Sequence, residues 1–140
     1  MKSSNEIAFL YNFQDPERLR KTRNALLLMK ARSKVVEEDQ ILQPVGVLAG
    51  MLEPVETEPA DLSAFTDEML VICGFNSRRI DDLLVRLRKA GVGNIKYKAA
   101  LTPTNMHWTG LELYHELAKE REAIANGTAA DHEETPTTEE

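Results

Sequence analysis

Cys73 and the histidines are the side chains of this sequence best suited to catalysis. A thiolate at Cys73, beside Gly74 at the end of an apolar run, could act as a nucleophile with His107 as its base. The run EMLVICGF supplies no cation to stabilise a thiolate, so a buried structural cysteine is the favoured interpretation. His107 and His115 are accompanied by no HExxH or CxxC pattern. We therefore predict no catalytic residue, no metal ligand and no cofactor.

A second group of polar side chains lies in the segment KAALTPTNMHW, from Lys98 to Trp108. Loops that follow buried strands often hold ligand contacts, because the scaffold beneath them is rigid. Capping and turn formation are the competing explanation for threonine and asparagine here. The hydroxyl of Thr104 and the amide of Asn105 have no obvious local role. We therefore expect both residues, together with Trp108, to contribute more to binding than to stability.

Hydrophobic periodicity predicts four strands and four helices around these residues. Asp15 and Pro16 suit a helix N-cap and the first helical position, and Thr109 stands at capping-box spacing before Glu112. Gly91 is expected to stop the third helix. We expect strands at about 6–13, 33–37, 68–75 and 94–101, and helices at about 16–31, 41–52, 77–89 and 109–125.

The two halves of the chain resemble each other. EIAFLYNF and EMLVICGF share a glutamate, an apolar residue and a phenylalanine at one offset of 62 residues. Pseudo-repeats at about 5–52 and 67–122, with a linker at 53–66, then predict an α/β fold. Its four-stranded, mostly parallel sheet has flanking helices and is built from two similar strand-helix-strand-helix halves, with the first and third strands central. A ferredoxin-like α+β sandwich is the alternative, and it requires a hairpin at 41–52.

A parallel sheet would bring all four strand ends to one edge, which is the usual ligand position in such sheets. The residues expected there are hydroxyls, amides and aromatics, which orient small polar molecules without ionising near neutral pH. The candidate ligand-binding residues are Asn12, Phe13, Gly74, Phe75, Thr102, Thr104, Asn105 and Trp108.

Composition limits the partners that this chain is expected to have. The formal net charge is −6, and residues 126–140 hold five acidic residues with no Lys or Arg, so the remainder is nearly neutral. We expect no nucleic acid, and the basic face of the helix at 16–31 is interpreted as solvated, with an anion or partner patch as the alternative. The absence of a long apolar segment, of a secretory signal and of a second cysteine favours a cytoplasmic protein away from membranes.

We predict one α/β domain at 1–125 and a disordered acidic tail at 126–140, dispensable for folding.

The segments LLVRLRKAGVGNIKYKA and KAALTPTNMHW resemble the domain-of-unknown-function 3783 family, whose members have a strand ending in a Cys-Gly-Phe-like turn and a TPTN..W segment. The resemblance is strongest over residues 68–122, and LYNF and QPVGVLAG in the first half are similar to the N-terminal portion of full-length members. It implies a compact α/β module without an assigned activity, so no catalytic residues carry over.

Two functions are consistent with these observations. The first is a non-catalytic binding or regulatory module that takes a small polar ligand or a peptide at the strand-end crevice. The second is a small enzyme that uses Cys73 or a histidine in the same crevice. The absence of paired acids and bases along this edge favours the first. The expected partner is an unknown small molecule or protein, and a homo-oligomer is left open.

Overall fold

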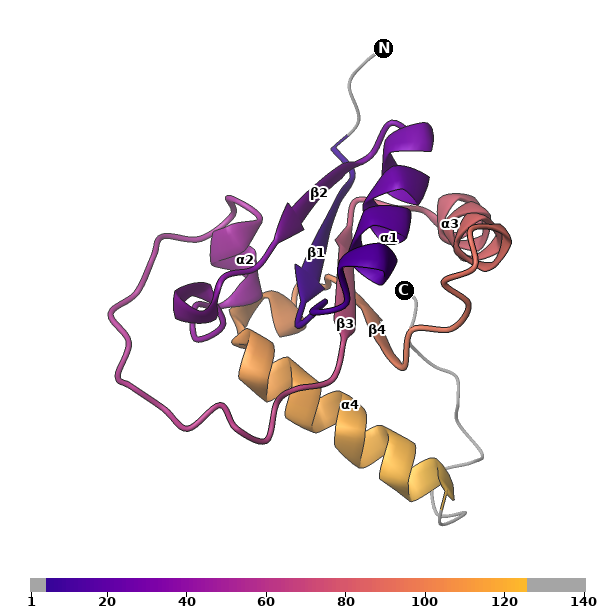
Figure 1. Ribbon diagram of the computed structural model, residues 1–140. Coiled ribbons are helices and arrows are strands. Elements are labelled where there is room, and N and C mark those ends of the chain that lie inside the picture. Colours follow the sequence, from indigo (N-terminus) through magenta and orange to yellow (C-terminus); the bar gives the residue numbers. More distant parts are fainter. Residues whose placement is uncertain (1–4, 126–140) are drawn as a thin grey trace.

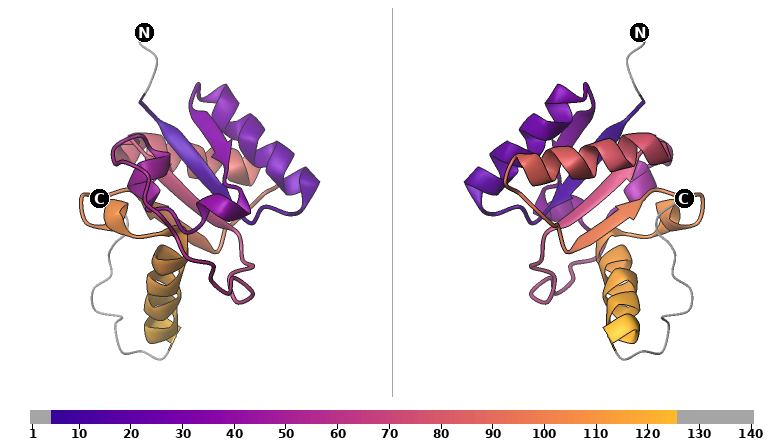
Figure 2. Two further views of the ribbon diagram at one scale, coloured as in Figure 1. Left: turned by 90° about the vertical axis from the view of Figure 1, so that its left-hand side faces the viewer. Right: turned by 90° about the vertical axis from the view of Figure 1, so that its right-hand side faces the viewer.

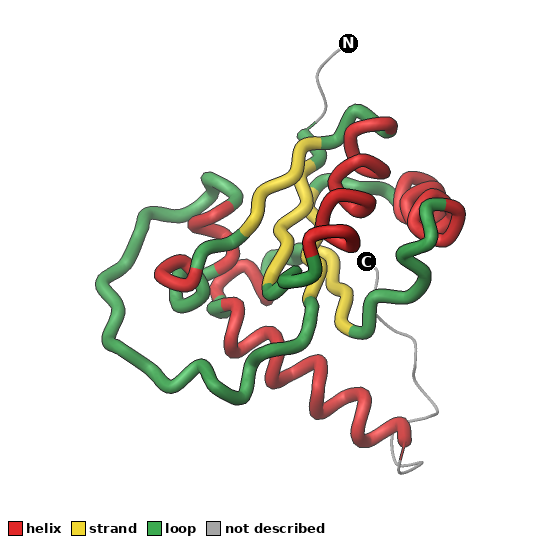
Figure 3. Tube along the Cα trace, viewed as in Figure 1, coloured by secondary structure: helices red, strands yellow, loops and turns green. Residues whose placement is uncertain are grey.

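The computed structural model describes residues 5–125, and the tail predicted at 126–140 lies outside these residues. Figure 1 labels the strands and the four α-helices in chain order, and Figure 3 colours them by type. The elements are β1 (Ile7–Tyr11), α1 (Pro16–Leu28), β2 (Arg32–Val35), the 3₁₀ turn η1 (Glu38–Gln40), α2 (Val45–Leu48), β3 (Met69–Cys73), α3 (Ser77–Lys89), β4 (Tyr97–Ala100), the 3₁₀ turn η2 (Asn105–His107) and α4 (Gly110–Ala125).

The four strands form one mixed sheet in the order β2-β1-β3-β4. The outer pairs, β1 with β2 and β3 with β4, are parallel, whereas the central pair β1 and β3 is antiparallel. This confirms a four-stranded α/β fold that is mostly parallel, with the first and third strands central. Residues 41–52 contain the short helix α2 and no strand, so the hairpin of the ferredoxin-like alternative is absent there.

Helices cover both faces of the sheet, as the side views in Figure 2 show. Alternate residues of β1 and β3 point to opposite faces, because side chains along a strand alternate. Leu10 and Leu70 pack under α1 and α3, whereas Phe9 and Val71 pack under α2, α4 and Phe65 of the long connection. The result is a sheet whose two central strands are buried on both sides.

Local signals place the helix starts where the sequence predicts them. The Asp15 carboxylate accepts the backbone N–H of Glu17, with Pro16 at the first helical position. Thr109 and Glu112 form the reciprocal capping box that opens α4, each side chain accepting the other residue's backbone N–H. The helix predicted at 41–52 is wrong in extent, because only Val45–Leu48 is α-helical. Gly46 and Gly50 lower the helix propensity of that segment.

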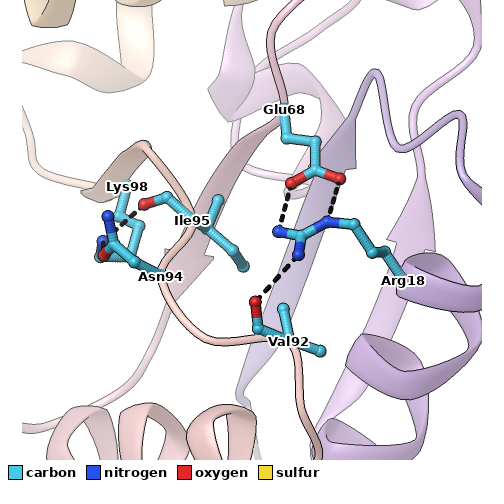
Figure 4. A network of polar contacts seen from close by, with 6 residues as sticks. All are labelled: Arg18, Glu68, Val92, Asn94, Ile95 and Lys98. Atoms are coloured by element: carbon cyan, nitrogen blue, oxygen red, sulfur yellow. Dashed lines mark hydrogen bonds and ion pairs between the residues drawn. The ribbon is translucent and has the colours of Figure 1, made fainter.

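Two arginines tie the halves of the chain together across the sheet. Arg18 of α1 makes two hydrogen bonds of 2.7 Å to the carboxylate of Glu68, and Arg79 of α3 holds Glu6 in the same way at 2.8 and 2.6 Å. Each guanidinium also donates to a backbone carbonyl of the half that supplies the carboxylate, at 2.9 Å for Arg18 and 2.6 Å for Arg79. Figure 4 shows the Arg18 contacts. We call these two doubly hydrogen-bonded arginine–glutamate pairs the arginine forks. They are reciprocal, because each half supplies one arginine and one glutamate.

The connection at 53–66 contributes to the core through Phe65, which is 3% exposed. Its ring stacks on Tyr114 of α4, with 4.5 Å between the ring centroids. Tyr114 donates a hydrogen bond to Asp67, and burial followed by the bond and charge of Asp67 raises the pKa of Tyr114 to about 12. The segment predicted as a linker therefore fixes α4 against the sheet. No helix between residues 5 and 125 is long and apolar enough to cross a membrane.

Candidate functional site

The predicted gathering of four strand ends at one edge is wrong. β1 and β3 run antiparallel, with Ile7 opposite Cys73 and Tyr11 opposite Met69, so the carboxyl ends of β1 and β2 lie at the edge opposite to those of β3 and β4. The connection between α2 and β3 is long enough for either direction of β3, so local sequence does not fix the direction. The candidate residues therefore divide into two sites, Asn12 and Phe13 at one edge and the other six near the opposite edge.

The side chains of Asn12 and Phe13 are already engaged in contacts that hold the fold together. Asn12 has a φ of 63°, and its side-chain amide donates to the carbonyls of Phe65 at 3.0 Å and Asp67 at 3.1 Å. Phe13 is 6% exposed and belongs to the core beneath α1 and α3. A cavity of about 380 Å³ adjoins both residues, but the Asn12 amide is already turned to the connection that leads into β3. We assign these two residues a structural role.

The TPTN segment is held together by its own hydrogen bonds. The Asn105 side chain accepts the backbone N–H of Thr102 at 2.8 Å and donates to the Ala100 carbonyl at 3.0 Å. The backbone N–H of Asn105 donates to the Thr102 hydroxyl at 3.0 Å. The premise that the Asn105 amide lacks a local role is therefore wrong. Thr104 is exposed, and half-buried Trp108 packs on the core beneath α4.

Gly74 and Phe75 do line an open crevice. It has a volume of about 510 Å³ and lies beyond the carboxyl end of β3, against Leu101. A groove of about 380 Å³ between α3 and β4 adjoins it. Both hollows are lined by Ile72, Ser77, Ile80 and Ala100, so together they form one continuous channel along the edge of the sheet. We call this channel the α3–β4 groove.

The groove exists because β4 carries a small residue where larger ones would close it. Ala100 pairs with Ile72 and Lys98 pairs with Leu70, so both β4 residues face the layer of α1 and α3. A methyl group and a flexible lysine cover less than leucine or isoleucine would, which leaves a hollow between α3 and β4 whose accessible lining is the partly buried Ile80, Leu84 and Ala100, above the buried Leu70 and Ile72. Sequence reasoning did not select Leu84, Lys98 or Ala100, and the only signal was the pair of alanines in a strand.

The outer edge of β4 is not covered by another described strand. Leu101 donates its backbone N–H to Ile72 at 2.8 Å, so the alternation of a strand turns the backbone groups of Lys98 and Ala100 away from β3. The Ala100 carbonyl accepts from Asn105, whereas the Ala100 N–H points outward from the sheet. Such an edge is a template for an added strand.

Polar groups stand at the rim of this apolar channel. The Lys98 ammonium donates to Asn94 at 2.9 Å and to the Ile95 carbonyl at 2.6 Å, as Figure 4 shows. Burial lowers the pKa of Lys98, and the nearby Arg121 lowers it further. Ser77 and Asp81 lie on α3 at the same groove. These few polar groups can orient a bound chain, while the floor provides apolar contact.

Catalytic chemistry finds little support at this edge. Cys73 is 8% exposed, and burial raises the pKa of its thiol, an effect that the charge of Arg32 only partly opposes. His107 and His115 are exposed on η2 and α4. Within residues 5–125, no three His, Cys, Asp or Glu side chains are grouped to hold a metal ion. The thiol is thus held in its neutral, weakly nucleophilic form.

We expect native Cys73 to react slowly with a thiol reagent, because burial both hides the sulfur and disfavours the thiolate. Labelling with a disulfide reagent at pH 7 should be far slower than in the urea-unfolded protein, which is the matched control. Native labelling faster than that of a free thiol would overturn this prediction and restore the enzyme hypothesis.

Fold and site together define an α/β protein with a mixed four-stranded sheet and an open groove beside an edge strand. Residues 68–124 match the family model described as Domain of unknown function (DUF3783). This match over a segment of the chain confirms the resemblance of the second half to that family. The matched residues include both walls of the α3–β4 groove. Neither a curated protein nor a solved structure matches the chain significantly.

Proposed function

We propose that this protein is a non-catalytic binding module that takes an extended peptide in the α3–β4 groove. The observation that carries the proposal is the continuous channel of apolar residues beside the free edge of β4. An added strand would pair with the outward backbone groups of Lys98 and with the outward N–H of Ala100, whose carbonyl is already bonded to Asn105. Its alternate side chains would enter the gap above Leu70 and Ile72. A peptide fits this channel better than a small polar ligand, because most of the lining residues are apolar.

The candidate residues have different roles in the proposed binding. Gly74 and Phe75 line the end of the channel and would contact the peptide. Thr102 and Asn105 would act indirectly, because their mutual bonds fix the chain at the end of β4. The proposed compartment is the cytoplasm, which suits a chain whose only cysteine is unpaired.

A charge placed in the groove should abolish binding without unfolding the protein. Leu84→Glu puts a carboxylate into the channel, whereas Val85→Glu adds the same charge at the next position of α3, whose side chain is 39% exposed. The full chain and both variants are mixed with a pool of random nonapeptides, and retained peptides are identified by mass spectrometry after gel filtration. We expect the wild type and Val85→Glu to retain the same peptides, and Leu84→Glu to lose at least 90% of them.

Circular dichroism establishes that each variant is folded before binding is compared. Retention of no peptide by the wild type would contradict the proposal. Equal retention by a folded Leu84→Glu variant would also contradict it, because binding would then lie outside the groove.

The proposed module includes an internal repeat of its strand-helix-strand unit. Three features support this repeat: the same order of elements in both halves, the central pair Phe9 and Val71 of the antiparallel register, and the reciprocal arginine forks. In such an arrangement the α3–β4 groove corresponds to the groove between α1 and β2. The two grooves differ sharply in charge.

A further inference from the structure

The groove between α1 and β2 is basic, although the protein as a whole is acidic. Its volume is about 1080 Å³, and its apolar lining includes Ile7, Leu19 and Leu27. Five cationic residues line or border this apolar floor. Arg20, Arg23 and Lys30 belong to α1 or follow it, whereas Arg32 and Lys34 of β2 pair with Ile7 and Phe9 and so stand on the other face of the sheet at the same edge.

The cations of this groove are largely uncompensated. No carboxylate is among the described residues that line it. Arg20 pairs with Glu17 at 2.6 Å, but the described part of the chain gives no ion pair to the other four cations. Residues 16–34 contain seven basic residues and one acidic residue, whereas residues 35–76 contain nine acidic residues and no basic one. Although the whole chain has a net charge of −6, this groove is locally positive and suited to bind anions.

The outer edge of β2 offers backbone groups to the same groove. Arg32 and Val36 donate their N–H groups inward to Glu6 and Leu10, so the alternation of the strand turns the backbone of Ser33 and Val35 outward. β2 ends the sheet in the strand order. Charged residues on an edge strand can simply prevent aggregation. That function does not account for the further cations contributed by α1, or for Leu27, which is 68% exposed beside them.

We propose that this groove binds an extended acidic segment of a partner protein, added as a strand to β2. Its backbone would pair with Ser33 and Val35. On the α1 side of the sheet it would place carboxylates beside Arg23 and Lys30 and apolar side chains over Leu27, and on the other side a carboxylate would meet Arg32. This ligand uses all three features of the groove. A single-stranded nucleic acid would use only the charge, because no aromatic residue among those described lines the groove for base stacking. This inference does not rest on the α3–β4 groove.

The test uses the full chain and a fluorescein-labelled octapeptide in which glutamates and valines alternate in pairs, so that each face of the added strand carries both. The double variant Arg23→Glu/Lys30→Glu removes two groove cations. Arg86→Glu/Arg88→Glu makes the same net charge change on α3, outside the groove. We expect fluorescence anisotropy to show at least a tenfold weaker affinity for the first variant and less than a twofold change for the second. A matched octapeptide of lysine and valine should not bind.

A second variant separates strand addition from charge attraction. Ser33→Pro removes one outward N–H and leaves every cation in place, and proline is tolerated at sheet edges. We expect at least a fivefold loss of affinity. Should this variant fail to fold, hydrogen exchange of the wild type decides, because bound peptide must slow exchange at Ser33 and Val35.

Four results would overturn the proposal. Equal losses in the two double variants would show attraction by net charge alone. Unchanged exchange at Ser33 and Val35 with the peptide bound would exclude strand addition. Tighter binding of a 20-nucleotide single-stranded DNA through the same cations would make the groove a nucleic-acid site. Self-association that is lost in Arg23→Glu/Lys30→Glu would make a second copy of this chain the occupant.

Discussion

Replacing Arg79 with alanine is expected to lower the free energy of unfolding by about 3 kcal/mol, because the buried carboxylate of Glu6 loses two charge-assisted hydrogen bonds. The side chain of Glu6 is 8% exposed, and Arg79 donates two hydrogen bonds to it and a third to the Met29 carbonyl. The effect falls at the low end of the range for buried pairs, because the Arg79 side chain is itself 31% exposed. Urea unfolding followed by circular dichroism measures the loss.

Arg78→Ala is the matched control for this prediction, since Arg78 is the exposed neighbour on the same helix. It should change the free energy of unfolding by less than about 0.5 kcal/mol. Arg18→Ala should have a smaller effect than Arg79→Ala, because the side chain of Glu68 is 20% exposed and can be better hydrated. Equal stability of Arg78→Ala and Arg79→Ala would show that the fork adds nothing to the fold.

The order of strands and helices could be predicted because it depends on local patterns. The apolar alternation of β1 and β3, Asp15 with Pro16, and the spacing of Thr109 and Glu112 each act within a few residues. The antiparallel pairing of Phe9 with Val71 joins residues far apart in the chain, and no turn fixes its direction. In the sequence, only the reciprocal charges of Glu6 and Arg79, and of Arg18 and Glu68, indicated how the two halves of the chain pack together.

The candidate site was harder to predict for a physical reason. The α3–β4 groove exists because Ala100 has only a methyl side chain, and a small residue in a strand is a weak signal of a binding site in a sequence. Asn105 stood out because it is polar and follows a strand, yet its amide is consumed by Thr102 and Ala100. The position of Gly74 and Phe75 at the end of the channel was accessible, because it follows directly from where β3 ends.

Gly110→Ala is expected to destabilise the protein by about 2 to 3 kcal/mol, because a side chain at this position overlaps a buried ring. An added Cβ would lie 3.0 Å from Cζ of Tyr11 and closer still to Cε2 of the same ring. Tyr11 is fully buried and packs beside Phe65, so a shift of the ring would disturb its core neighbours. Gly110 cannot retreat without cost either, because its N–H donates to the Ile41 carbonyl at 3.0 Å. Urea unfolding again measures the loss.

Gly50→Ala and a double variant together identify the cause of this loss. An added Cβ at Gly50 meets no atom within 4 Å, so that variant reports only the cost of its φ of +81°, about 1 kcal/mol. Tyr11→Leu removes the ring that the new methyl group of Gly110→Ala would strike, so the double variant Tyr11→Leu/Gly110→Ala should be more stable than the sum of the two single changes predicts. Strict additivity would mean that α4 does not need the close contact between Gly110 and Tyr11, and that the start of this helix can shift freely over the sheet.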